Sequence, residues 1–179
     1  MTVMSHKLDA VLEEGLRPDA TFMKSRNGEK WGYIDEFEQE RGHAKCVFET
    51  DEEGSFLSMN LFSEEEQDND SHDVLDIINV MNGVQGQLTF FQNPASGMVH
   101  ARREFIVEGR KPEAIKEMVF ERYKRMQDIF DDLMWALDWK QKTAGNHKAL
   151  FEALAKRETQ RKRKHDRNHG RDGFDPAYA

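Results

Sequence analysis

The chain has 179 residues, of which 34% are charged and 37% hydrophobic, and its formal net charge is −8. This length suits one domain with a sizeable hydrophobic core. Residues 156–179 carry 8 basic and 4 acidic side chains, whereas residues 1–155 carry 18 basic and 30 acidic ones. Because residues 1–155 are acidic, they are unsuited to binding nucleic acid, and such binding could only involve the basic tail.

The first half of the chain predicts one helix and four strands. Apolar residues recur on one side of a short segment that Pro18 ends. The dipeptide Asn27–Gly28 is a strong signal for a hairpin turn. Residues 36–42 form either an exposed loop or an extension of the second strand. The expected elements are a helix over 5–16 and strands over 22–26, 31–34, 44–48 and 56–62.

The second half predicts a helix, two strands around a turn at Asn93–Gly97, and a long helix. Ser71 can cap the first helix and Gly83 can end it. Pro112 suits the first position of the long helix, in which apolar residues recur at helical spacing from Ile115 to Leu137. The expected elements are helices over 71–83 and 112–139, strands over 87–91 and 98–107, and a further helix over 149–154 that the basic residues after it can prolong.

These elements predict an α+β fold in which an antiparallel sheet has helices packed on one face and a basic helix follows at the C-terminus. We expect the α+β domain to span residues 1–140, the C-terminal helix residues 141–165, and a disordered tail residues 166–179. Because Cys46 is the single cysteine, no disulfide can form within the chain, which is typical of a reducing compartment. No signal peptide and no apolar run of roughly 20 residues is found, so we expect a cytoplasmic protein without a membrane segment.

The central stretch resembles one known family. The heptapeptide Asp76–Asn82 resembles the end of a helix in the YbjN family. Residues 87–91 and 98–105 resemble that family's strand pair, a short aromatic strand before a longer one that carries an arginine, and the helix over 115–137 resembles its closing helix. Members share the fold of type III secretion chaperones and are described as candidate sensory transduction regulators without known chemistry. The resemblance covers residues 20–140 and implies a module that binds extended peptides and often forms homodimers.

Three polar residues of this stretch are candidates for partner binding. Asn79 and Asn82 lie near the end of a helix, and Arg103 shares the inward face of its strand with Val99 and Phe105. The three side chains could face one groove beneath the long helix. A structural role is the alternative, because asparagines satisfy helix carbonyls and a half-buried arginine needs an acidic partner.

Trp135 and Trp139, four residues apart on the long helix, are two further candidates. They form either a surface for a partner protein or a docking site for the C-terminal helix.

The basic run Arg161, Lys162, Arg163 and Lys164 is a candidate for binding polyanions. No aromatic residue is interleaved with it, so base stacking is unsupported, and a solubilising tail is the alternative. From Lys156 onward no apolar stripe follows, so we expect this segment to gain nothing from packing and its deletion to leave the melting temperature unchanged.

No motif predicts catalysis, a metal site or a cofactor. The seven histidines are scattered without zinc-site spacing. Asp68–Asp73 begins like a calcium loop but lacks its glycine and its final glutamate, and Cys46 lies in the middle of a strand, where a core thiol is expected. The leading prediction is a non-enzymatic module that binds a protein or peptide. The alternative is a nucleic-acid-associated regulator that acts through its basic tail.

Overall fold

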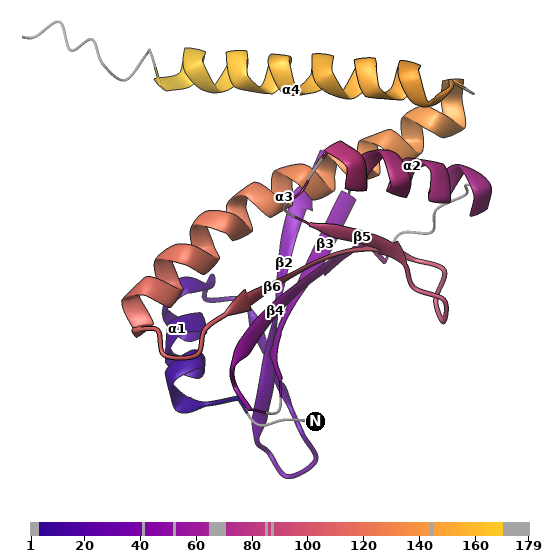
Figure 1. Ribbon diagram of the computed structural model, residues 1–179. Helices are drawn as coiled ribbons and strands as arrows, with labels where there is room; N and C mark the ends of the chain where they lie inside the picture. The colour runs from indigo at the N-terminus through magenta and orange to yellow at the C-terminus, as the bar shows by residue number, and fades with distance from the viewer. Residues whose placement is uncertain are drawn as a thin grey trace, which may run out of the picture.

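The computed structural model describes residues 4–40, 42–51, 53–64, 71–84, 86, 88–143 and 145–169 (Figure 1). Its elements are α1 (His6–Gly15), β1 (Thr21–Lys24), β2 (Lys30–Gln39), β3 (Gly42–Thr50), β4 (Phe56–Phe62), α2 (Ser71–Val84), β5 (Thr89–Gln92), β6 (Val99–Ile106), α3 (Pro112–Thr143) and α4 (His147–His169). The predicted α+β class is confirmed. Residues 36–39 extend the second strand, which settles the alternative that the sequence left open.

The strands of the described residues form one antiparallel sheet in the order β1-β2-β3-β4-β6-β5. The turn between β1 and β2 requires a glycine, because Gly28 has a φ of 81°. Side chains alternate between the two faces of the sheet. On the inner face, Cys46 lies opposite Leu61 and Phe48 opposite Met59, and all four are buried.

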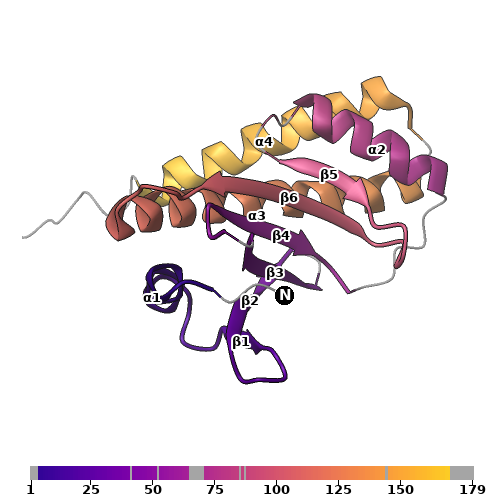
Figure 2. The same cartoon turned by 60° about the horizontal axis from the view of Figure 1, so that its bottom comes forward.

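Helices α1 and α3 cover this inner face (Figure 2). Five apolar residues of α3 that the helical spacing predicts as core are buried: Ile115, Val119, Met126, Phe130 and Leu133. The close approach of α1 to α3 depends on Gly15, because a Cβ there would lie 1.9 Å from the ring of Phe120. Among the described residues, no helix is both long and apolar enough to cross a membrane.

A buried polar contact joins α3 to the sheet. The hydroxyl of Tyr123 donates a hydrogen bond to Oδ2 of Asp35 over 2.6 Å, and Nη2 of Arg17 donates to Oδ1 over 3.1 Å. Burial, together with the neighbouring Cys46 and Asp35, raises the pKa of Tyr123 above its usual range, so the phenol stays protonated and donates. The carboxylate of Asp35 is therefore satisfied despite its burial.

Helix α4 is fixed to the body through ion pairs, which corrects the expectation that the basic segment gains nothing from packing. Arg157 reaches Asp131 over 2.6 Å and Asp132 over 2.8 Å, and the guanidinium of Arg161 reaches Asp132 over 2.8 Å. Arg157 also contacts Glu40 at the end of β2 over 2.6 Å. The prediction was wrong because it considered only apolar contacts. The partners of these arginines are acidic residues on α3, and an apolar stripe in the sequence gives no information about such pairs.

The C-terminal helices end at other residues than the sequence predicts. Helix α3 ends at Thr143 and α4 extends to His169, so residues 166–169 of the expected disordered tail are helical. The remaining residues of that tail, 170–179, lie outside the described residues.

Candidate functional site

The outer face of the sheet carries no helix within the described part of the chain (Figure 2). Phe56 on β4 and Ile106 on β6 are directly opposite each other in the register. Their side chains point outward and are 41% and 59% exposed. Two large apolar side chains that are adjacent and solvent-exposed therefore form a small apolar patch on this face. We call these two residues the β4–β6 patch.

At the other end of the same strands, an aromatic stack covers the outer face. The imidazole of His100 lies between the rings of Phe62 and Phe91, with centroid distances of 5.1 and 5.3 Å. Nδ1 of His100 lies 3.1 Å from Oδ1 of Asn60, and Nε2 is buried without a hydrogen-bond partner among the described residues. Burial lowers the pKa of His100, so the neutral ring is favoured. At this end, the outer face of the sheet is therefore covered by the stacked rings of Phe62, His100 and Phe91.

Arginines gather around the open end. Nε of Arg110 donates to the backbone oxygen of Ile106 over 2.8 Å, and Arg102 pairs with Glu104 over 2.7 Å on the outer face. On the inner face, the guanidinium of Arg103 lies 5.1 Å from the centre of the Phe105 ring. Burial and the nearby positive charge of Arg122 lower the pKa of Arg103. The site therefore combines apolar surface with several positive charges.

Next to these arginines, the surface is hollowed. A depression of about 550 Å³ lies at the edge of the sheet where β5 begins. It is lined by Gly86, Leu88, Thr89, Phe91, Arg102, Arg103 and Glu104. Its lining includes Arg102 and Glu104 from the outer face of β6 and Arg103 from the inner face.

The described contacts of Asn79, Asn82 and Arg103 differ, and the common groove expected beneath the long helix stays a prediction. The carboxamide of Asn82 accepts from the Phe90 N–H over 2.9 Å and donates to the Phe90 carbonyl over 3.1 Å. Asn79 is exposed on α2. Arg103 lies on the inner face as predicted, where burial and the nearby positive charge of Arg122 lower its pKa, and the acidic partner expected for it stays a prediction.

Trp135 and Trp139 make contacts within the chain, which agrees with the prediction of a docking site for the C-terminal helix. The rings of Trp135 and Trp139 stack at 6.4 Å, and the guanidinium of Arg157 on α4 lies 5.3 Å from the Trp135 ring centre. Trp139 lies against Gly145, where an added Cβ would be 2.2 Å from the ring. Leu150 of α4 is buried in the same core.

Two residues of the predicted polyanion-binding run are already paired. Arg161 contacts Asp131 and Asp132, and Lys162 lies 3.1 Å from Glu158. Arg163 is exposed, and the side chain of Lys164 lies outside the described residues. Binding of polyanions by this run stays a prediction.

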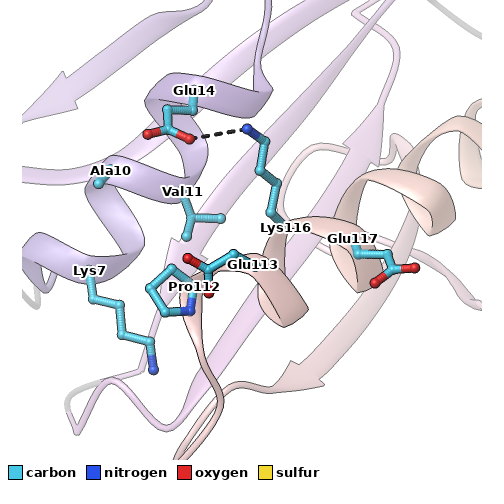
Figure 3. A pocket seen from close by; sticks show the side chains of 8 residues that line it. All are labelled: Lys7, Ala10, Val11, Glu14, Pro112, Glu113, Lys116 and Glu117. Carbon is cyan, nitrogen blue, oxygen red and sulfur yellow. Dashed lines mark hydrogen bonds and ion pairs between the residues drawn. The ribbon is translucent and has the colours of Figure 1, made fainter.

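A second depression, of about 480 Å³, lies between α1 and the start of α3 (Figure 3). Its charges are mixed. Lys116 pairs with Glu14 over 3.1 Å, and Nζ of Lys7 donates to the backbone oxygen of Arg110. These contacts join α1 to α3 and its preceding loop, which is a structural role.

Cys46 is a core residue, as the sequence predicts. Burial raises the pKa of its thiol well above the usual value, so the nucleophilic thiolate is disfavoured. Sequence reasoning missed the β4–β6 patch, although a signal was present: strict alternation along β6 places Ile106 on the face that carries Arg102 and Glu104. Comparison with protein-family models, with curated protein sequences and with solved structures gave no match to this chain.

Proposed function

We propose that this chain is a non-enzymatic protein-interaction module of the YbjN-like type, which binds a segment of another protein at the β4–β6 patch. The observation that carries the proposal is the exposure of Phe56 and Ile106 side by side on a face that no helix of the described residues covers. Apolar side chains at such a position lose contact with water when a partner covers them, and this burial is the main driving force of association.

The surroundings of the patch select the chemistry of the partner. Arg110 lies beside Ile106, and Arg102 and Arg103 follow along the same strand. Carboxylates of a partner segment can reach the exposed guanidinium groups of Arg102 and Arg110, while its apolar side chains cover the patch. We therefore propose an apolar and acidic segment of a partner protein as the occupant.

A peptide library displayed on phage and selected on the immobilised protein tests this proposal. Selected peptides should be enriched in apolar and acidic residues, and Ile106→Glu should weaken their binding at least about tenfold, because it removes apolar contact and repels carboxylates. The matched control is Leu75→Glu, since Leu75 is 48% exposed on α2. Peptides that bind the Ile106→Glu protein as well as they bind the wild type would refute the proposed site.

A further inference from the structure

Helix α4 is attached to the rest of the chain by two different kinds of contact. Its first half packs through apolar side chains, since Leu150 is 1% exposed and Leu154 packs against the core. Residues 155–163, by contrast, contain no large apolar side chain, and none of them is buried. The contacts of this second half with α3 come from charged groups, among them Arg157 and Arg161.

The two arginines are four residues apart on α4 and share two carboxylates. Nη2 of Arg157 lies 2.6 Å from Oδ2 of Asp131, and Nη1 of Arg161 donates to Oδ2 of Asp132 over 2.9 Å. The backbone N–H of Glu40 donates to Oδ1 of Asp131 over 3.1 Å and thereby orients this carboxylate. The donors of a guanidinium group form a planar fork that matches a carboxylate. We call the contact of the two arginines with the two aspartates the arginine contact.

The arginine contact does not involve the connection between α3 and α4. Its carboxylates lie on α3, and Arg157 lies about three turns after the start of α4. Every copy of the chain carries the same donors and the same acceptors. The α4 of a second copy therefore brings the same guanidinium groups to the same carboxylates, as happens when two identical chains exchange one element.

The connection between α3 and α4 is short and closely packed, and after it α4 turns back over the body (Figure 1). Only residues 144–146 separate the two helices. A Cβ at Gly145 would lie 2.2 Å from the ring of Trp139, and the Gly145 carbonyl accepts from Nζ of Lys140 over 2.7 Å. The turn therefore depends on a glycine at this position. Short connections of this kind favour exchange of the element that follows, because strain in the turn is relieved when it opens.

We propose that two copies of this chain exchange α4, so that the arginine contact of each copy is formed with the α4 of the other. This inference goes beyond the proposed function, because it uses a surface other than the β4–β6 patch. The two contacts of the dimer are equivalent, as two-fold symmetry requires. Within one chain, the connection holds α4 beside its own body at an effective concentration of about 1 mM, so exchange in the wild-type protein requires concentrations in this range.

Sedimentation velocity of the full-length Gly145→Ala variant tests the exchange. The added methyl group collides with the Trp139 ring in the closed turn and is free of it once the turn opens. The protein concentration at which half of the chains are dimeric should therefore fall at least about tenfold relative to the wild type. Gly83→Ala is the matched control, because a Cβ at Gly83 meets no atom within 4 Å. A Gly145→Ala protein that dimerises no more readily than the wild type would overturn the proposal.

Two further substitutions show whether the arginine contact holds this dimer. Arg157→Met together with Arg161→Met should abolish the dimer of the Gly145→Ala protein, because the second half of α4 then lacks its charged contacts in either copy. Ile106→Glu should leave the dimer unchanged. A dimer that survives the loss of both arginines, or one that Ile106→Glu removes, would refute the exchange of α4.

A mixing experiment identifies the partner as a second copy of the chain. One variant carries Arg157→Glu and Arg161→Glu, and the other carries Asp131→Lys and Asp132→Lys. Within each variant like charges repel α4 from its own body, whereas in a mixture each α4 meets opposite charge on the other copy. Size-exclusion chromatography with light scattering should show a monomer for each variant alone and a 1:1 dimer for the mixture. A mixture that stays monomeric, although circular dichroism shows both variants to be folded, would contradict the exchange, and if either variant is unfolded the Gly145→Ala series decides.

Discussion

Arg157 holds α4 on the body, and its replacement by methionine should destabilise the protein by about 2 kcal/mol. Its guanidinium contacts Glu40 and Asp131 over 2.6 Å and Asp132 over 2.8 Å. The side chains of Arg157 and Asp132 are only 15% and 10% exposed, so these pairs are weakly screened. Methionine keeps the apolar stem against Trp135 and removes the charge.

The magnitude follows from what remains after the change. A hydrogen bond to a charged group contributes about 1.5–3 kcal/mol, and leaving a buried charge with no partner costs about 3–5 kcal/mol. Arg161 still contacts Asp132 over 2.8 Å, so the loss falls at the lower end of these ranges. For a chain of this length, about 2 kcal/mol corresponds to roughly 4–8 °C in Tm.

Urea denaturation followed by circular dichroism measures this loss, with the Arg157→Met, Asp132→Asn and double variants as a cycle. The double variant should lose less than the sum of the single variants, because the two residues interact. The control is Lys162→Met, whose pair with Glu158 is exposed and should contribute no more than about 1 kcal/mol. A change below about 0.5 kcal/mol for Arg157→Met would refute the role of these ion pairs.

Three further predictions concern the core, the response to pH and the basic run. Phe130→Ala should cost about 3–5 kcal/mol in urea denaturation, because the ring is fully buried, and a loss below about 1 kcal/mol would show that the face of α3 is wrongly assigned. Burial lowers the pKa of His100, so near and below the ordinary histidine pKa the unfolded chain binds more protons than the folded one. The free energy of unfolding should therefore fall as the pH drops from 7 to 5. His100→Gln should flatten this pH dependence, and an unchanged slope would contradict the assignment. Since Arg161 and Lys162 are paired, filter binding of DNA or RNA should be weak, and tight, salt-sensitive binding that is lost in an Arg163→Ala, Lys164→Ala double variant would favour the nucleic-acid alternative.

The elements of the fold were predictable because each depends on local pattern. The alternation of apolar and polar residues, the helical spacing and the turn residues predict six strands and the long helix, each close to its observed position. The inward side of Arg103 follows in the same way from the alternation of its strand. The resemblance to the YbjN family stays a prediction.

The contacts of α4 could not be predicted in this way. Whether Arg157 faces solvent or Asp132 depends on how the chain turns after Thr143, and residues 25 positions apart carry no local signal of their pairing. The β4–β6 patch is different, since Ile106 could be placed on the outer face from alternation alone. What the sequence did not reveal is that none of the helices in the described ranges covers this face.

Asn82 has a consequence for the association of the protein with itself. Its carboxamide engages both backbone groups of Phe90, so a side chain blocks the outward edge of β5 at that residue. At the opposite end, β1 has only four residues, and Nζ of Lys24 lies 4.8 Å from the Phe22 ring centre, a charge that discourages edge-to-edge growth. Fibre-like stacking of copies needs long, continuous edges. Both outer strands of the sheet therefore carry a feature that opposes edge-to-edge association of copies.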